Sequence, residues 1–434
     1  MIYLDYNATT PLSTPAWEAM RPYLERHFGN PSSVHRAGRE ARAAIDNARD
    51  ALAALLRIRP NELIFTSGGT EANNLALLGL ARNRASHGKH LISNRAEHHA
   101  VLNTLEHLEA QEGFEVTWLQ VSGAGLIDPA ALAEAIRPDT TLVSIMTANN
   151  ETGVIQPMAE ISAVCRERGV LFHSDMVQSF GKQRGETGSP PAVIPSEAEG
   201  FRGASRKPFV DGSESVPENR RDPSTPLRFA QDNLLVELVD AASFAAHKFY
   251  GPKGAGFLYL RAGLPIDQIQ FGGAHEAQRR PGTENVAAIA GMAAAAELVR
   301  QNPPDESELR DQLWAGISAT FPAAQRNGVG APRLANTLNV SFPGYSSETL
   351  LMALDLEGIC ASSGSACMVG SVVASHVLLA MGLPMERAAS AVRFSLGKAT
   401  TEAEINETIA ALARIFTRFA LRKSGATPPQ HALV

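Results

Sequence analysis

The stretch FTSGGTEANNLALLGLA, residues 65–81, runs from an apolar strand through a glycine turn into a helical pattern. Four more short apolar segments follow it along the chain: KHLISNR, EVTWLQV, TTLVSIMTANN and GVLFHSD. Helical runs such as residues 71–84 and 158–168 lie between these segments. Strand–helix alternation at this spacing is typical of a mostly parallel sheet with helices on both faces. The sequence therefore predicts an α/β fold.

The sequence changes character near Pro265. An alanine-rich helical run, the apolar segments TLNVSF and AVRFSLG, and further helical runs indicate a smaller α+β domain. We predict a large domain over residues 15–264 and a small domain built from residues 1–14 and 265–434. Residues 184–232 interrupt the large domain with seven prolines, many charges and no hydrophobic period. That composition predicts a disordered surface insertion.

Composition excludes several classes of partner. The net charge is −6 with acids and bases interspersed, so no basic surface for nucleic acid is expected. The longest small-apolar run, residues 286–296, is too short to span a bilayer, and no membrane association is expected. The N-terminus lacks a basic segment typical of signal peptides, and three scattered cysteines suit a reducing compartment. We therefore predict a cytoplasmic protein, and no metal site.

Lys248 lies in SFAAHKFYGPKGAGFLYLR, residues 243–261, directly after a short apolar strand. Most lysines at strand ends are solvated surface residues. Here Ala245 and Ala246 would let a flat molecule approach the backbone, and a lysine in such a pocket can form a Schiff base. Lys248 is therefore a candidate for binding a carbonyl cofactor such as pyridoxal 5'-phosphate.

Three other strand ends carry groups that such a cofactor needs. Gly68, Gly69 and Thr70 start a helix whose N-terminus suits a phosphate. Asp175 ends the strand VLFHSD and can pair with a pyridinium nitrogen, and His98 follows another strand and can stack on a ring. Each signal alone is weak, but the carboxyl ends of parallel strands meet at one edge of a sheet.

Cys367 lies among small residues in SSGSACMVGS, residues 362–371. From its neighbours alone it is a passenger thiol, a metal ligand or a mobile nucleophile. A loop of serine, glycine and alanine has little preferred conformation and permits travel. Cys360 and Cys165 follow apolar residues and are predicted to be small core residues.

Several motifs occur in order along nearly the whole chain outside the insertion: MIYLDYNATTP, NPSSVHRAGREAR, FTSGGTEANN, ANNETGVIQP, HSDMVQSFGK, AAHKFYGPKGAGFLY, RRPGTENV, SSGSAC and VRFSLG. In these motifs the chain resembles the cysteine desulfurases of the NifS/IscS type, in class V of the pyridoxal-phosphate aminotransferases. The resemblance implies the type I fold of pyridoxal-phosphate transferases.

The resemblance also implies roles for single residues. Lys248 would hold pyridoxal 5'-phosphate as a Schiff base, and His98 would stack on the ring and assist proton transfer. Asp175 would pair with the ring nitrogen and Gln178 with the ring hydroxyl. The phosphate would be bound by Gly69, Thr70 and His247, with Thr283 contributed by the other subunit of a homodimer. Arg393 would bind the substrate carboxylate with help from Asn150.

In such enzymes a protein thiolate takes the sulfur of L-cysteine, leaving L-alanine and a persulfide. The resemblance assigns that role to Cys367, in a segment of the long-loop group. It implies sulfur delivery to scaffold or carrier proteins, for iron–sulfur cluster assembly or tRNA thiolation.

Three features depart from the family. Ala245 stands where a serine usually donates to the phosphate, the insertion separates Asp175 from Lys248, and residues 372–375 read VVAS rather than LEPS. Two alternatives stay open: a selenocysteine lyase or other class V lyase or transaminase, and a non-catalytic scaffold that only binds partners.

Overall fold

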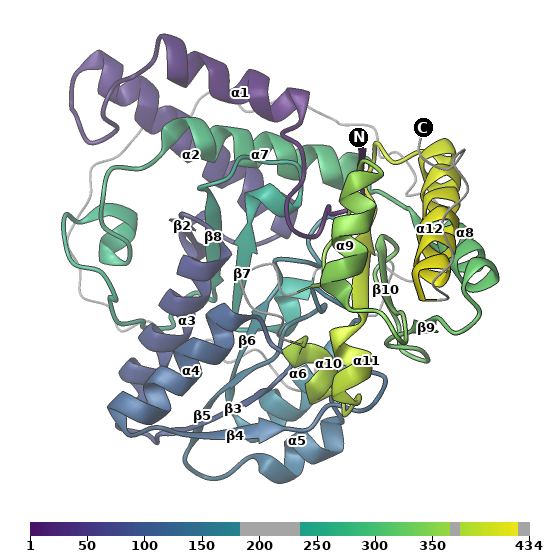
Figure 1. Cartoon of the computed structure of the whole chain (residues 1–434). Coiled ribbons are helices and arrows are strands. Elements are labelled where there is room, and N and C mark those ends of the chain that lie inside the picture. The colour runs from purple at the N-terminus through teal and green to yellow at the C-terminus, as the bar shows by residue number, and fades with distance from the viewer. Residues whose placement is uncertain (183–234, 365–373, 424–434) are drawn as a thin grey trace. The chain divides into compact units, whose positions relative to one another are not determined.

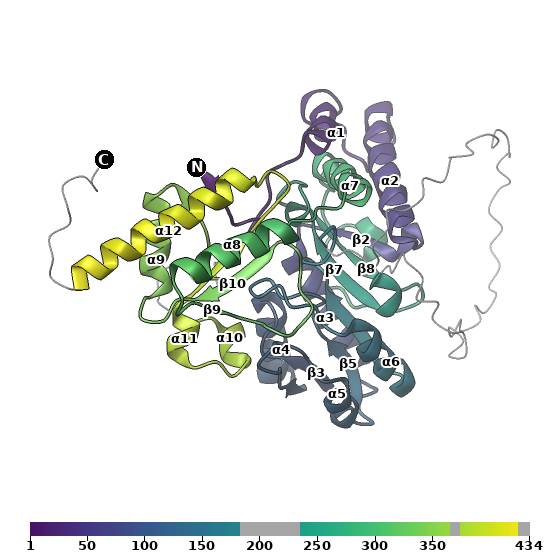
Figure 2. The same cartoon turned by 90° about the vertical axis from the view of Figure 1, so that its right-hand side faces the viewer.

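The computed structural model of the chain describes residues 1–182, 235–364 and 374–423. The predicted insertion and Cys367 itself lie outside the described residues. Everything described belongs to one unit, shown in Figures 1 and 2. No helix in the described ranges is long and apolar enough to cross a membrane.

A seven-stranded sheet forms the centre of the fold. Six of its strands run in the same direction and one, β8, is antiparallel to both neighbours. The prediction of a mostly parallel sheet is therefore confirmed. The order across the sheet is β2 (Leu63–Thr66), β8 (Gly256–Leu260), β7 (Ala241–Ala245), β6 (Leu171–Asp175), β5 (Thr140–Ser144), β3 (His90–Asn94) and β4 (Glu115–Leu119).

Helices cover both faces of this sheet, because alternate strand residues point to opposite sides. On one face, Ile64, Leu91 and Leu142 pack with α3 (Gly69–Arg84) and α4 (His99–Glu112). On the other, Phe65, Ile92 and Val143 belong to a larger core. The helices of that core include α2 (Arg36–Leu56), α5 (Pro129–Ala135), α6 (Met158–Arg168) and α7 (Val286–Gln301).

The alanine-rich helix α7 packs closely, as its composition predicts. It lies beside α1 (Thr14–Glu25) and α2 (Figure 2). A Cβ at Gly291 would come 2.5 Å from Met20 Cγ, so the close approach of α1 and α7 requires glycine at this position.

A smaller antiparallel sheet has its own core. Its strand order is β12 (Ala391–Ser395), β10 (Thr337–Ser341) and β9 (Gln325–Arg326). Leu338, Val340 and Phe394 pack with helices α8 (Ser307–Thr320), α9 (Ser347–Leu356) and α12 (Glu402–Lys423). Short elements complete these parts of the fold: the helices α10 (His376–Ala380) and α11 (Met385–Ala389), and the 3-10 turns η1 (Pro60–Glu62), η2 (Leu235–Leu238), η3 (Ala246–Lys248) and η4 (His275–Gln278).

The N-terminal residues join this smaller sheet region. Strand β1 (Ile2–Tyr3) pairs in parallel with β11 (Ile359–Cys360), and Leu4 belongs to the same core as β10 and β12. The chain then crosses to the large sheet, where Thr10 N–H donates to the carbonyl of His247. Residues 5–10 therefore pass between the two sheets. The domain boundaries at residues 14 and 264 stay a prediction.

Candidate active site

Lys248 ends the short turn η3, directly after β7. Its Nζ donates to two backbone carbonyl oxygens, at 2.6 Å from Asn7 O and 2.8 Å from Ala8 O. The side chain is half-buried. The N-terminal segment thus forms the wall against which the lysine nitrogen lies.

Asp175 ends the neighbouring strand β6 and is buried. Its carboxylate accepts hydrogen bonds from Asn73 Nδ2 at 2.7 Å and from the N–H of Val177 at 2.9 Å. Two donors hold the carboxylate in one orientation. Asp175 pairs across the sheet with Ser243, on the strand that leads to Lys248.

His98 caps the N-terminus of α4. Its Nδ1 accepts a hydrogen bond from the N–H of Ala100 at 3.0 Å, so Nε2 carries the proton of the neutral ring. Burial lowers the pKa of His98, the charge of Asp175 raises it and that of Lys248 lowers it further. Both charges act on the imidazole, so the structure brings His98, Asp175 and Lys248 into one site.

Gln178 lies three residues after Asp175, in a series of turns over residues 176–182 rather than in a helix. The side chain is buried, and its Nε2 donates to Asn7 O at 2.9 Å. The carbonyl of Asn7 therefore receives both Lys248 and Gln178. No role was predicted for Asn7, although the motif MIYLDYNATTP contains it.

The N-terminus of α3 offers free donors. No described residue accepts a hydrogen bond from the N–H groups of Gly69 and Thr70, which is the usual state of a helix start. A Cβ at Gly69 would lie 2.6 Å from Val177 Cγ2, so glycine is needed for this close approach. Thr70 is exposed, and Gly68 has a φ of +153°. These are the properties of an anion site.

Ala245 lies beside the start of α3, and His247 directly precedes Lys248. The position of a Cβ at Gly69 is 3.6 Å from Ala245 Cβ, which places Ala245 next to the proposed phosphate site. Ser243, two residues earlier, is hydrogen-bonded to His173 Nε2 at 3.0 Å. Burial lowers the pKa of His247 to about 4, and its Nδ1 lies 3.3 Å from Thr9 Oγ1.

Arg393 on β12 is almost fully buried. Its Nη2 pairs with Asp5 Oδ1 at 2.6 Å, and its Nη1 donates to the carbonyl of Asn150 at 2.9 Å. Its Nε has no partner among the described residues. A buried guanidinium with an unused N–H can still donate to an anion. Asp5 was not singled out from the sequence.

Cys367 lies outside the described residues, but the described residues on both sides of it come close to Glu151. Ser375 Oγ donates to Glu151 Oε2 at 2.5 Å. A Cβ at Gly364 would lie 2.5 Å from the same oxygen. Glu151 follows Asn150, whose carbonyl binds Arg393. The described residues on either side of Cys367 thus meet next to the proposed substrate arginine.

The other two cysteines are accounted for. Cys165 is buried in the main core, as predicted, and burial raises its pKa to about 12. Cys360 is half-buried on the short strand β11 and does not belong to a core. The prediction of a core position for Cys360 is therefore wrong. Among the described strands, β11 pairs only with β1, and the side chain of Cys360 stays partly exposed.

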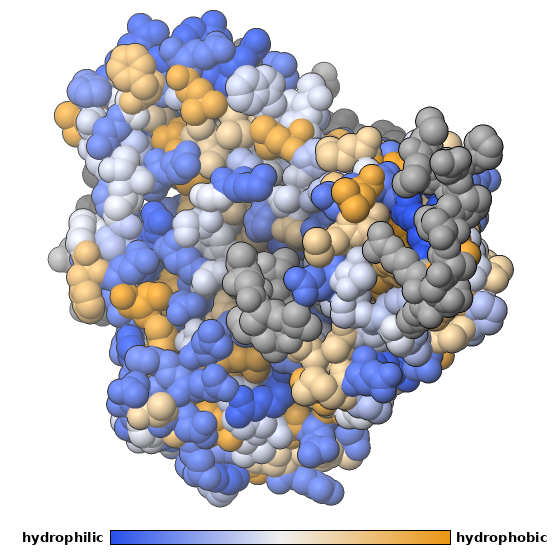
Figure 3. Space-filling view, viewed as in Figure 1, coloured by the Kyte–Doolittle hydropathy of each residue, from blue (hydrophilic) through white to orange (hydrophobic). Residues whose placement is uncertain are grey.

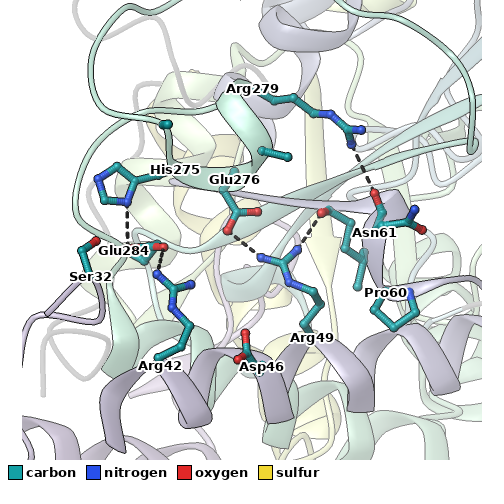
Figure 4. Close-up of a pocket in the computed structure, with 13 residues that line it drawn as sticks. Ser32, Arg42, Asp46, Arg49, Pro60, Asn61, His275, Glu276, Arg279 and Glu284 are labelled. Carbon is teal, nitrogen blue, oxygen red and sulfur yellow. Dashed lines mark hydrogen bonds and ion pairs between the residues drawn. The ribbon is translucent and has the colours of Figure 1, made fainter. Parts of the chain in front are cut away.

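Thr283 is exposed, whereas Lys248, Asp175 and His98 are buried or half-buried. The adjacent Glu284 lines a cavity of about 660 Å³ together with Ser32, Arg42 and His275 (Figure 4). Glu284 pairs there with Arg42 Nη2 at 2.8 Å and His275 Nδ1 at 3.2 Å. The lining of this cavity includes the neighbour of Thr283 but not Lys248, Asp175 or His98.

The residues present fit pyridoxal 5'-phosphate. The charges of an amine and of a fixed carboxylate both act on one imidazole, and a helix start with free N–H groups lies beside Ala245 at the end of β7. A buried arginine with an unused donor lies at Asn150. This donor set matches an aromatic cofactor with a phosphate and a substrate with a carboxylate.

Comparisons with known proteins agree with this chemistry. The family model "Aminotransferase class-V" matches residues 2–187 and 236–407, so the chain belongs to the class-V aminotransferase family. Membership of this family implies pyridoxal 5'-phosphate as cofactor. The resemblance in the motifs is confirmed, and the unmatched residues 188–235 overlap the predicted insertion at residues 184–232.

Full-length relatives with known descriptions include proteins called cysteine desulfurase IscS. The chain is 41% identical over 421 residues to "Cysteine desulfurase IscS" of Dictyoglomus turgidum, covering 96% of this chain and 95% of the relative. The protein of the same name from Methanosarcina thermophila is 39% identical over 412 residues, covering 94% and 90%. A solved structure described as "NIFS-LIKE PROTEIN" matches with a TM-score of 0.79 and 32% identity over 96% of this chain and 99% of that one. "SspA in complex with cysteine" matches with a TM-score of 0.71 and 31% identity, over 91% and 99%.

Proposed function

We propose that this chain is a cysteine desulfurase that converts L-cysteine to L-alanine and retains the sulfur as a persulfide on Cys367. Full-length similarity of about 40% to proteins of that name supports the activity. The observation that carries the proposal is the site itself. The charges of Asp175 and Lys248 both act on His98, and the flanks of the Cys367 segment meet at Glu151, beside the Arg393 site.

The protein's residues bind and orient the cofactor. Lys248 would hold pyridoxal 5'-phosphate covalently, Asp175 would pair with its ring nitrogen, and Gln178 would bind its ring hydroxyl. His98 would stack on the ring. The free N–H groups of Gly69 and Thr70 would bind the phosphate together with His247. When bound, the cofactor supplies an electron sink for the substrate.

The substrate is held by its carboxylate. Arg393 presents an unused Nε–H in a buried position, where a charge-assisted hydrogen bond is strong. Asp5 and the carbonyl of Asn150 fix the guanidinium plane. Asn150 thus acts on the substrate through Arg393.

The thiolate of Cys367 accepts the sulfur. It attacks the sulfur atom of cysteine, an S–S bond forms, and the C–S bond of cysteine breaks. The electron pair of that bond stays with the three-carbon remainder, which takes up a proton and leaves as alanine. The reaction consumes no external oxidant or reductant. Neutral His98 carries a proton on Nε2 and can move it at the site.

A second copy of this chain completes the site in this proposal. Thr283 is exposed, and the large apolar side chains of Phe28, Val34 and Phe271 are more than four-fifths exposed. Figure 3 shows further apolar residues over α1, at the top of the view. Ser32, between Phe28 and Val34, lines the same cavity as Glu284 beside Thr283. A homodimer would cover this surface and bring Thr283 to the partner's phosphate site.

Sulfur acceptors are scaffold or carrier proteins, for iron–sulfur cluster assembly or tRNA thiolation. Turnover of L-cysteine in the presence of a thiol reductant tests the activity. Alanine and sulfide should form in equal amounts, and Arg393→Lys should raise the KM for cysteine because lysine cannot make the planar contact. Faster release of selenide from L-selenocysteine with negligible cysteine turnover would instead identify a selenocysteine lyase. No turnover of either substrate would indicate a non-catalytic scaffold.

A further inference from the structure

Lys182 is a buried lysine for which the proposed function has no role. It lies four residues after Gln178, and about a tenth of its surface is exposed. Buried lysines are rare unless an acid pairs with them. Among the described residues, no carboxylate lies within ion-pair distance of Lys182. Its Nζ instead donates to two side-chain amides, to Gln178 Oε1 at 2.7 Å and to Asn7 Oδ1 at 3.0 Å.

The contact with Lys182 decides which way the Gln178 amide faces. The ammonium group of a protonated lysine is a donor only, so its partner on Gln178 is the oxygen. The other end of the amide faces Asn7 O at 2.9 Å, and a carbonyl is an acceptor only, so its partner must be the nitrogen. A flipped amide would set N–H against ammonium and oxygen against oxygen. Two independent contacts therefore impose the same orientation.

This orientation leaves one donor of Gln178 unused. An amide nitrogen carries two N–H groups, and the carbonyl of Asn7 takes one of them. The oxygen of the amide is occupied by Lys182. Gln178 can therefore offer an N–H, and not an oxygen, to a further group.

Asn7 is fixed by the same lysine. Its Oδ1 accepts from Lys182 Nζ and from Asn336 Nδ2, both at 3.0 Å. Its Nδ2 donates to Thr337 Oγ1 at 2.9 Å. The backbone carbonyl of this fixed residue receives Lys248 Nζ. Lys182 thus reaches both Gln178 and Lys248 through hydrogen bonds.

Three charged groups of the described residues act on Lys182, namely Lys248, Arg393 and Glu306. Its pKa lies well below the ordinary lysine value, because it is buried and because Lys248 and Arg393 are positive. The buried Glu306 acts in the opposite direction without a hydrogen bond to Lys182. A neutral Lys182 keeps two N–H groups, one for Gln178 Oε1 and one for Asn7 Oδ1, but it also gains a lone pair. Only its ammonium form excludes the flipped amide by itself, whereas the carbonyl of Asn7 disfavours that flip in either form.

We propose that Lys182 is a positioning residue that fixes the Gln178 amide so that its free N–H serves the ring hydroxyl of the cofactor. The inference rests on the proposed function, in which Gln178 binds that hydroxyl. A donated N–H favours the negatively charged ring oxygen. It thereby weakens the hold of this oxygen on the proton of the Lys248 nitrogen, and lowers the pH at which that proton is lost. A flipped amide would present an oxygen and have the opposite effect.

A double-mutant cycle on the holoenzyme tests this role. The measured quantity is the pH midpoint at which the absorption of the cofactor attached to Lys248 changes. Lys182→Met and Gln178→Leu should each raise the midpoint by about one pH unit, the size of one hydrogen bond to a charged group. Lys182→Met should also speed loss of cofactor on dialysis. Lys182→Arg, which keeps only donors, should restore most of the midpoint.

The double variant decides between orientation and charge. If Lys182 acts by holding Gln178, Lys182→Met has no further effect once Gln178 is leucine. If Lys182 acts through its charge alone, the two shifts add and the inference is overturned. An unchanged midpoint in Lys182→Met overturns it as well. Lys182→Gln, whose amide permits both orientations of Gln178, replaces methionine in the same cycle if the latter does not fold. A wild-type protein without any such absorption band would refute the proposed function instead.

Discussion

At the scale of single residues, the chemistry rests on how the chain holds a few side chains against its own backbone. Lys248 Nζ lies between the carbonyls of Asn7 and Ala8, at 2.6 and 2.8 Å. Backbone carbonyls hold an amine in place without the charge of a carboxylate, which would favour its protonated, non-nucleophilic form. The N-terminal segment is therefore part of the site.

Replacing Lys248 tests the attachment of the cofactor. Lys248→Ala should remove the visible absorption of the purified protein, because no other described amine lies between Asn7 O and Ala8 O. Spectra before and after borohydride treatment measure this. Retained colour that borohydride reduces would assign the attachment to another lysine.

Ala245 is predicted to weaken the binding of the cofactor without abolishing it. Ala245→Ser places a hydroxyl beside the start of α3, where Ala245 Cβ lies 3.6 Å from the position of a Cβ at Gly69. A charge-assisted hydrogen bond contributes roughly 1.5–3 kcal/mol, so affinity should increase by about one to two orders of magnitude. Equilibrium dialysis gives the two dissociation constants.

Ser243→Ala is the matched control for this variant. Ser243 Oγ already bonds His173, so its loss should leave cofactor affinity unchanged. Equal affinities of the Ala245→Ser variant and the wild type would mean that another donor already serves the phosphate there.

At the scale of elements, buried polar contacts link the central strands. His173 on β6 bonds Ser144 on β5 through Nδ1 and Ser243 on β7 through Nε2. The residue is fully buried, and burial lowers its pKa from 6.5 to about 3. One imidazole thus joins three strands in its neutral form.

This histidine predicts a loss of stability in acid. The folded-state pKa is below the unfolded one, so the unfolded chain takes up the proton first as pH falls. Stability is complete above about pH 6.5 and is lost progressively towards pH 3. Lowering the pH from 7.5 to 5 should decrease the free energy of unfolding by about 2 kcal/mol through His173. Denaturant titrations at both pH values measure it, and His173→Gln should reduce the pH difference by that amount. The same pH difference in both proteins would contradict the assignment.

The flanks of the Cys367 segment allow a second test at this scale. Gly364 and Gly358 both have positive φ, 95° and 76°. A Cβ at Gly364 would meet Glu151 Oε2 at 2.5 Å, whereas a Cβ at Gly358 meets no atom within 4 Å. Gly364→Ala should displace Glu151 and lower cysteine turnover about tenfold with normal cofactor content. Gly358→Ala should cost about 1 kcal/mol of stability through backbone strain alone. Equal turnover of the two variants would show that Glu151 does not position this segment.

At the scale of the whole molecule, the sequence predicted the sheet well. Apolar segments such as residues 63–66 and 171–175 carry strands, and the run at residues 158–168 is helical as predicted. These elements follow local patterns of apolar residues, which a single sequence displays directly. The antiparallel placement of β8 was not predicted, because strand direction depends on how the chain returns across the sheet.

The candidate catalytic residues were predicted from the sequence, but the residues that hold the side chains of the site in place were not. Asp175, His98 and Lys248 follow strands, and strand ends are visible in a sequence. The supports are Asn7, which accepts from Lys248, Asp5, which pairs with Arg393, and Lys182, which donates to Asn7 and Gln178. Asp5 and Arg393 are 388 residues apart in the chain. Such pairings depend on the tertiary fold, and no local pattern indicates them. The four-residue spacing of Gln178 and Lys182 was the one available signal.

The central claim is that sulfur passes from cysteine to Cys367, and intact-protein mass spectrometry after a single exposure to L-cysteine without reductant tests it most directly. The proposed function predicts that the wild-type chain gains the mass of one sulfur atom, mapped to the peptide containing Cys367. Cys165→Ser and Cys360→Ser should gain it too, whereas Cys367→Ser should keep the cofactor spectrum and its change on adding cysteine but gain no sulfur. Sulfur retained by the Cys367→Ser variant, or lost in the Cys360→Ser variant, would contradict the assignment.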